Sequence, residues 1–116
     1  MPISTTDVPQ SRTFQRELDP HGRLDYTIDW ANILGENNIV SVTTTLSAEA
    51  ITAGLEIDAE STDGQTTTVR LSVESTQRDD EAFNAPFGID LAFKQNLEDS
   101  TGQIWEFSYV VTVVQQ

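Results

Sequence analysis

The chain has 116 residues, a length typical of one domain that folds without metal ions or cross-links. It contains 19 acidic and 6 basic residues, a formal net charge of -13, and no cysteine. This charge argues against a nucleic-acid-binding protein, because phosphate backbones require a cationic surface, and the lack of cysteine excludes disulfides and thiolate chemistry.

The acidic excess has two interpretations. It can serve solubility alone, or it can match a basic surface on a partner. The first ten residues, MPISTTDVPQ, have neither a basic segment nor an apolar core, so no secretory signal is predicted. No apolar run is long enough to span a bilayer, and anionic membranes would repel the acidic surface. We therefore expect a soluble protein that binds neither membrane nor nucleic acid.

Residues 1–13 show no periodicity and are predicted to form an extended N-terminal arm. Such an arm can contact a neighbouring subunit, or it can pack along its own domain, and the sequence leaves both open. On the first interpretation its interface residues are Pro2, Ile3, Val8, Pro9 and Arg12.

A period of two begins at residues 12–18 (RTFQREL), which predict an edge strand. Residues 24–30 (LDYTIDW) alternate apolar and polar side chains throughout and predict a half-buried strand. Asp29 is then placed to cap a short helical turn that Gly35 ends.

Four further strands are predicted from β-branched and alternating runs. Their apolar faces include Leu55, Ile57 and Ala59 in one strand and Val69, Leu71 and Val73 in its partner. The turn Asp63-Gly64 between these two is a hairpin signal. The predicted ranges are 39–46, 53–62, 66–76 and 87–98.

The acidic segment 78–86 (RDDEAFNAP) is predicted to be a loop. The turn DSTGQ then leads into a last strand over 104–114, which is apolar on both faces. A strand of this kind is unusual in a two-layer sandwich, so its second face, with Ile104, Val110 and Val114, is a candidate interface. Phe14, where the arm meets the first strand, joins this candidate interface.

These elements predict an all-β fold, an immunoglobulin-like antiparallel two-sheet β-sandwich of about seven strands with an extended N-terminal arm. The arm would cover 1–13 and the sandwich 14–116. No helix longer than two turns is expected. The paired cysteines of antibody domains are missing, so the chain is not an antibody-type domain.

The carboxylates were considered as catalytic groups. Asp25 and Asp29 lie about 13 Å apart on one strand, too far to share a metal ion or a glycosidic bond. Glu56, Asp58 and Glu60 are spaced by about 7 Å, a distance found in inverting glycosidases. Neighbours on one flat strand, however, point the same way into water and do not face each other across a cleft. The pattern therefore favours a solvated strand face.

The remaining candidate sites also have structural interpretations. His21 is the only histidine and has no cysteine or second histidine with which to form a zinc site. The run Asp79-Asp80-Glu81 matches no calcium loop and favours a solvated turn. Trp30 and Trp105 could stack on sugars, but both lie in register with apolar faces and are expected in the core. We therefore predict no catalytic or metal-binding residue, no cofactor and no enzymatic activity.

One segment also resembles a known protein family. DPHGRLDYTIDWANILGENNIVSVTTTLS, residues 19–47, resembles the opening of a family of tailed-phage fibre–tail adaptor or neck proteins, and AGLEI resembles its next strand. The similarity covers residues 19–60. The matching positions are Asp19, Pro20, Leu24, Asp25, Tyr26, Thr27, Asp29, Trp30, Leu34, Ile39, Val40 and Ser41.

This resemblance implies a non-enzymatic virion structural protein, made in the host cytoplasm. It would act as an adaptor at the head–tail neck or where tail fibres attach, in multiple copies of a symmetric assembly. Its partners would be other virion proteins of the portal or neck, tail, fibre or capsid. The alternatives are a capsid decoration protein and, from another class, a carbohydrate-binding module of a host-recognition apparatus.

Overall fold

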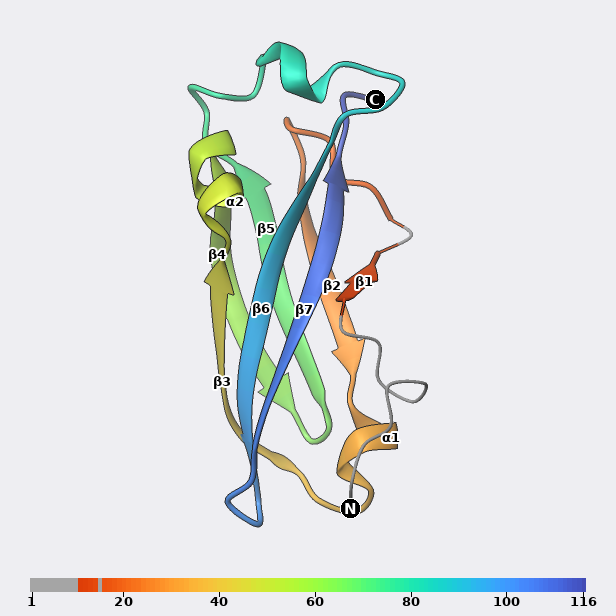
Figure 1. The fold of residues 1–116 in the computed structure, drawn as a ribbon, viewed down its shortest axis with the longest axis vertical. Coiled ribbons are helices and arrows are strands. Elements are labelled where there is room, and N and C mark those ends of the chain that lie inside the picture. The colour runs from red at the N-terminus through yellow and green to blue at the C-terminus, as the bar shows by residue number, and fades with distance from the viewer. Residues whose placement is uncertain (1–10, 15) are drawn as a thin grey trace.

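The computed structural model describes residues 11–14 and 16–116, which fold into two β-sheets that face each other (Figure 1). The helices of the described residues are short, none longer than two turns, as expected from the sequence. In chain order the elements are β1 (Ser11–Thr13), β2 (Arg23–Asp29), α1 (Ala31–Leu34), β3 (Ile39–Leu46), α2 (Ala48–Ala53), β4 (Leu55–Asp63), β5 (Thr66–Val73), the 3-10 helix η1 (Glu81–Phe83), β6 (Ile89–Asp99) and β7 (Ile104–Val113).

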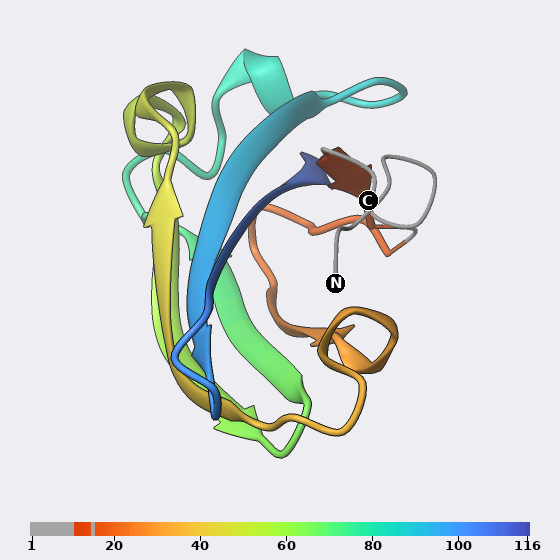
Figure 2. The same ribbon diagram turned by 60° about the horizontal axis from the view of Figure 1, so that its bottom comes forward.

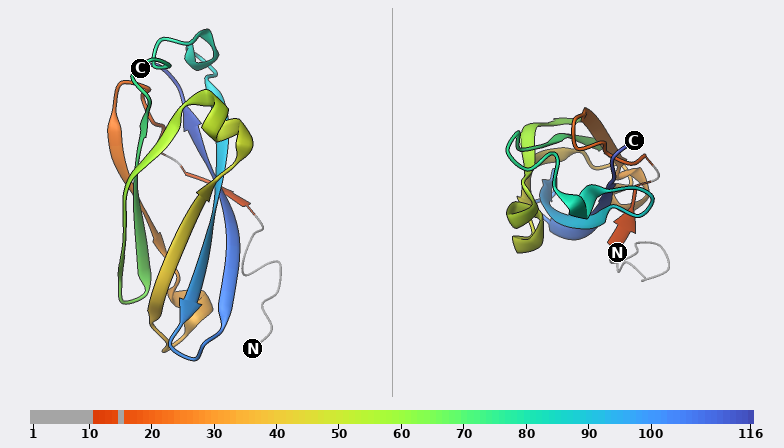
Figure 3. Two further views of the ribbon diagram at one scale, coloured as in Figure 1. Left: turned by 90° about the vertical axis from the view of Figure 1, so that its left-hand side faces the viewer. Right: turned by 90° about the horizontal axis from the view of Figure 1, so that it is seen from above.

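The strand order confirms the predicted immunoglobulin-like sandwich. One sheet has the order β1-β7-β6-β3 and the other β2-β5-β4. All pairs are antiparallel except β1 with β7, which are parallel. In the immunoglobulin fold the second, fourth and fifth strands likewise share one sheet, and the third, sixth and seventh strands share the other. Figure 3 shows the layers from the side and from one end.

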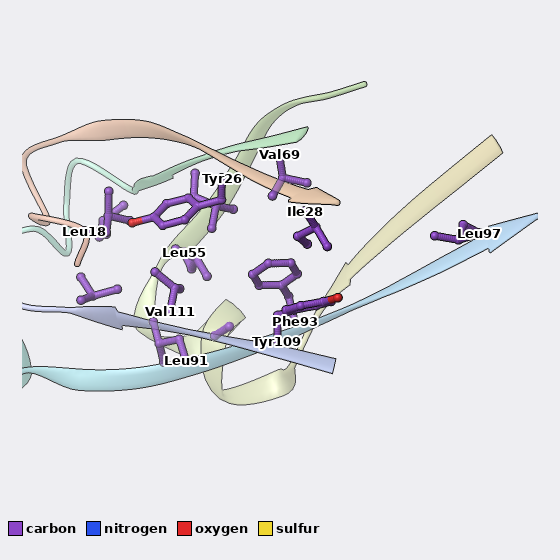
Figure 4. Packing of buried hydrophobic residues seen from close by; sticks show 14 of the residues in the cluster. Leu18, Tyr26, Ile28, Leu55, Val69, Leu91, Phe93, Leu97, Tyr109 and Val111 are labelled. Atoms are coloured by element: carbon purple, nitrogen blue, oxygen red, sulfur yellow. The ribbon is translucent and has the colours of Figure 1, made fainter. Parts of the chain in front are cut away.

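The core lies between the two sheets and is built from the inward positions of the alternating strands. Tyr26, Ile28 and Trp30 are buried, as the LDYTIDW pattern predicts. Phe14 joins an aromatic cluster with Tyr26, Phe93 and Tyr109, at ring-centroid distances of 4.8 to 6.0 Å. Burial raises the pKa of Tyr26 to about 12, and its hydroxyl donates to the Arg16 carbonyl. Figure 4 shows Tyr26, Ile28, Phe93 and Tyr109 between the two sheets.

A chain of buried polar side chains crosses the core. Trp30 Nε1 donates to Thr67 Oγ1 over 3.0 Å, and Thr67 Oγ1 donates to Gln95 Oε1 over 2.8 Å. Gln95 Nε2 donates in turn to Thr44 Oγ1. These hydrogen bonds join β5 of one sheet to β6 and β3 of the other. They supply the partners that a buried amide and hydroxyl require.

The predicted strand over 12–18 was placed too far along the chain. The strand is Ser11–Thr13, and it pairs with Ser108 to Val110 of β7. Beyond it Leu18 makes only an isolated bridge to Val113 and is buried in the core. The strand therefore ends early because the chain turns inward to bury Leu18 between the sheets.

Two other details differ from the sequence prediction. Ala59, expected in the core, is exposed because the β4–β5 register shifts between Ile57 and Ala59. A bulge of this kind turns the following side chains to the other face. Helix α2 was not predicted; Ser47 caps its start through the Ala50 N–H.

Both predicted hairpins are present. Gly64 has φ +60° in the turn between β4 and β5. In the turn between β6 and β7, the buried carboxylate of Asp99 accepts hydrogen bonds from the Thr101 hydroxyl and N–H, the Gln103 N–H and Trp105 Nε1. The hydroxyl bond of Thr101 is the largest cause of a lowered Asp99 pKa, about 2 instead of the ordinary 3.8. Asp99 thus organises the turn as an anion.

Asp99→Asn should lower the free energy of unfolding at neutral pH and have a much smaller effect near pH 2. Because the pKa of Asp99 is lower in the folded state, its stabilisation is present above the unfolded pKa and is lost as the pH falls through about 2. Urea unfolding of both proteins from pH 7 to pH 2 measures the difference. Asp63→Asn, at an exposed turn position, is the control; equal pH dependence of the two variants would contradict the role of Asp99.

Candidate interaction surfaces

The carboxylates of β2 serve local structure. Arg70 contacts Asp25 through two hydrogen bonds of 2.8 and 3.3 Å, and the hydrogen bond from Arg70 holds the pKa of Asp25 below its usual range. The N-cap of α1 is Trp30 and not Asp29 as predicted, but Asp29 accepts from the Ala31 N–H, the first N–H of the helix. On the same sheet face, Arg23 pairs with a β4 carboxylate, Asp58, at 2.9 Å. Among residues 11–14 and 16–116, no three acidic or histidine side chains are grouped to hold a metal ion.

His21 and the acidic loop are joined to each other. His21 Nε2 lies 2.9 Å from Asp79 Oδ1, with both side chains at the surface. The next residue, Asp80, caps η1 by accepting from the Ala82 N–H. The loop before β6 is thus tied to the turn before β2, and two of its carboxylates have structural partners.

The two tryptophans differ in accessibility. Trp30 is only 1 % exposed and donates to Thr67, so it cannot stack on a sugar. Trp105 is half-buried, and its indole N–H is bonded to Asp99 at 3.1 Å. A flat platform formed by both rings is therefore excluded.

The candidate interface residues of the arm cannot be placed in full. Pro2, Ile3, Val8 and Pro9 lie outside the described residues. Arg12 is the middle residue of β1, where its backbone is in register with Tyr109. The last three residues of the predicted arm therefore extend a sheet of their own chain.

The other four candidate residues have different environments. Phe14 packs in the aromatic cluster, and Val114 is buried with its N–H bonded to the Leu18 carbonyl. Val110 is half-buried, and its carbonyl accepts from the Phe14 N–H. Only Ile104 of these four presents a large apolar surface, being 73 % exposed. As candidate contacts in an assembly, these residues remain a proposal.

Three exposed apolar side chains were missed in the sequence. Val40 lies beside β6 at the register shift of β3, at the same end of the sheet as Ile104. Ile51 lies on α2, and Phe87, 85 % exposed, lies in the loop before β6. The alternation of apolar and polar residues could not identify Ile51 and Phe87, because neither lies in a strand.

Strands β3 and β4 lie side by side at the same margin of the sandwich, each at the edge of its own sheet (Figure 2). From Asp58 onward the residues of β4 lie at the surface; Asp58 pairs with Arg23 of β2, whereas Glu60 points to β3. Glu60 Oε2 accepts from the Thr44 N–H of β3 over 2.9 Å. A side-chain carboxylate therefore satisfies a backbone donor that no strand pairs.

At one end of the sandwich, α2 and η1 enclose a groove with a volume of about 440 Å³. Its apolar surface comes from Ala53, Ala82, Phe83 and Ile89. The carboxylates of Glu49 and Asp80 also line it. This is a concave surface with apolar walls and negative charge at its rim.

Residues 18–73 match the model of a protein family described as "Podophage GP4 fiber-tail adaptor protein gp77". This segment, a little under half of the chain, is similar to a tailed-phage fibre–tail adaptor family. The resemblance to a tailed-phage fibre–tail adaptor family, expected from the DPHGRLDYTIDW segment, is therefore confirmed over these residues. A search of curated proteins finds no match to the chain.

The family match has a clear boundary in the structure. It covers β2 through β5, and so contains the whole β2-β5-β4 sheet together with β3 and α2. Strands β6 and β7 and helix η1 lie beyond it. All nine candidate interface residues also lie outside the match. Among the described residues, no helix is both long and apolar enough to cross a bilayer.

Proposed function

We propose that this protein is a non-enzymatic adaptor of the virion, located at the head–tail neck or where tail fibres attach. The observation that carries the proposal is the family match over residues 18–73. On this proposal the protein is made in the host cytoplasm, joins other virion proteins through protein–protein contacts, and is present in multiple copies of a symmetric assembly.

The described residues support binding over catalysis. The charged side chains on the outer face of the β2-β5-β4 sheet pair with one another, as Asp25 does with Arg70 and Arg23 with Asp58. The buried polar groups Thr67 and Gln95 bond to each other inside the core. Such contacts stabilise a rigid domain. A rigid domain suits an adaptor, which binds two other proteins.

The proposed contact regions are the arm, residues 1–13, and the exposed end of β7 around Ile104. Arms and strand edges can bind by adding a strand to a neighbouring sheet, and exposed apolar side chains gain free energy when buried. The parallel pairing of β1 with β7 supports this proposal, because it puts the root of the arm at a sheet margin.

Deleting residues 2–10 should leave the sandwich folded and lower the amount of protein bound per particle by at least about tenfold. The reason is that the deletion spares β1 and every described core residue. Circular dichroism and urea unfolding check the fold, and quantitative immunoblotting of purified particles measures incorporation. Normal incorporation of the truncated protein would rule out the arm as a contact.

A density map of the whole particle tests the location. A ring of copies at the tail vertex agrees with the adaptor proposal. A lattice over the shell would instead identify a capsid decoration protein. A position at the distal tips of fibres would favour host recognition, including carbohydrate binding.

A further inference from the structure

The groove between α2 and η1 is a concave surface with apolar walls and carboxylates at its rim. Both short helices lie at the end of the sandwich that also carries the C-terminus (Figures 1 and 3). One wall, α2, belongs to the family-matched segment, whereas the other wall, η1, does not. The groove therefore has one wall inside the family-matched segment and one wall outside it.

The α2 wall is fixed by hydrogen bonds at both ends. Ser47 Oγ accepts from the Ala50 N–H, and the Gly54 N–H donates to the Ala50 and Ile51 carbonyls. Ala50 itself is buried against the core. A helix of one and a half turns is marginal alone, so these caps and this contact hold it in place.

The η1 wall is fixed as firmly. Phe83 is buried in the core, and its carbonyl accepts from the Gln115 N–H beyond β7. After η1 the chain passes so close to β7 that a Cβ on Gly88 would lie 2.2 Å from the Val113 carbonyl oxygen. The groove is thus formed in advance, which lowers the entropic cost of binding.

The surroundings of the groove are strongly acidic. Glu49 and Asp80 line it, and Glu81 lies next to Asp80 in the same loop. The basic residue of that loop, Arg78, directs its Nε to the Val73 carbonyl. The rim therefore has more negative charge than its neighbours neutralise, and the apolar interior lies beneath it.

We propose that this groove receives an aliphatic side chain from a segment of another virion protein, with lysine or arginine on either side of it. The inference rests on the proposed adaptor function and names the chemistry of one partner. The apolar interior would bury the aliphatic group, and the acidic rim would attract the flanking cations. On this proposal, part of the acidic excess of the sequence serves to attract a basic partner.

A second copy of this chain fits the groove poorly. The chain has 6 basic residues and a net charge of -13, so copies repel one another at this rim. Arg23, Arg70 and Lys94 are each paired with a carboxylate of their own chain. The proposal therefore commits to a basic segment of a different protein as the occupant.

A peptide titration of the isotope-labelled, full-length protein tests the chemistry directly. The probes are short peptides of alternating lysine and leucine, glutamate and leucine, and lysine and serine. The lysine–leucine peptide should shift the amide signals of Thr52, Ala53 and Ala82. A higher salt concentration should weaken its binding, because salt screens the attraction between opposite charges. The other two should bind at least about tenfold more weakly, because each lacks one of the two required features.

Two matched variants separate the groove from general attraction to an acidic protein. Glu49→Lys should raise the dissociation constant of the lysine–leucine peptide about tenfold. Glu56→Lys, the same exposed charge change on β4, should alter it by less than about twofold. Equal weakening by both variants, or signal shifts away from the groove, would overturn the proposal.

Photo-crosslinking in the particle identifies the occupant. Benzoylphenylalanine in place of Thr52 should crosslink to a basic segment of another virion protein, whereas the same group in place of Thr27 on the outer face of β2 should not give that product. A crosslink to a second copy, or none, in particles that contain the protein would overturn the inference. Particles that lack the protein would contradict the adaptor function instead, and the peptide titration would still decide the groove.

Discussion

Thr67→Val should lower the free energy of unfolding by roughly 2–6 kcal/mol, although it changes one small side chain for another of the same shape. The substitution removes the acceptor for the Trp30 indole N–H and the donor to Gln95 Oε1. Thr67 is buried completely, so water cannot replace either hydrogen bond without entering the core. Each unpaired buried group costs about 1–3 kcal/mol. Urea denaturation followed by tryptophan fluorescence measures the loss.

Thr68→Val is the matched control for this prediction. Thr68 is the next residue of β5, faces outward, and shares its hydroxyl bond with the exposed Thr27. We expect its replacement to change the free energy of unfolding by less than about 0.5 kcal/mol, because surface polar contacts contribute little. Similar losses for the two variants would show that the buried chain of hydrogen bonds does not stabilise the core.

Gly88→Ala should destabilise the fold by about 3 kcal/mol or more and displace the η1 wall of the groove. Gly88 has φ +61°, and its added Cβ would lie 2.2 Å from the Val113 carbonyl oxygen and 2.6 Å from Val114 Cβ. The backbone conformation alone costs an alanine about 1–2 kcal/mol. The clash adds to that cost, because the end of β7 must move. Thermal unfolding measures the stability. The dissociation constant of the lysine–leucine peptide shows whether the groove keeps its shape.

Gly64→Ala isolates the backbone contribution. Gly64 has nearly the same conformation, φ +60°, but no heavy atom lies within 4 Å of its added Cβ. It should therefore lose only about 1–2 kcal/mol and keep the peptide affinity of the unchanged protein. If Gly88→Ala behaved like Gly64→Ala, the close approach of the loop to β7 would not matter for stability.

The sequence predicted the parts of the fold that depend on local patterns. LDYTIDW has a fault-free alternation, and the structure buries Tyr26, Ile28 and Trp30 accordingly. Asp63-Gly64 has the turn chemistry of a hairpin, and the hairpin is present. In both cases a few neighbouring residues determine the outcome, so no knowledge of distant contacts was required.

The errors arose where distant contacts decide. Ala59 continued an alternating run, but a bulge opposite β5 turns it outward. The position of β1 depends on parallel pairing with β7, about a hundred residues away in the chain. Gln95 lies at an inward position because Thr67 and Thr44 from other strands provide its hydrogen bonds. No pattern within one strand contains this information.

The groove could not be predicted from the sequence, because it is formed by segments that are distant in the chain. Its walls come from α2 and η1, which are separated by the whole β4–β5 hairpin. In the sequence, Glu49 and Asp80 belong to unrelated segments, and Phe83 is one apolar residue in an acidic loop. The family resemblance could be identified because its matching residues are contiguous around LDYTIDW.

The Glu60 carboxylate that accepts from the Thr44 N–H has a consequence for crowded conditions. An unpaired strand edge can pair with the edge of another molecule and so lead to aggregation. This risk rises with the local concentration of the protein. By occupying a donor at the middle of β3, Glu60 makes edge-to-edge growth of fibres less favourable. At high local concentration this contact therefore favours separate folded domains over edge-to-edge stacking.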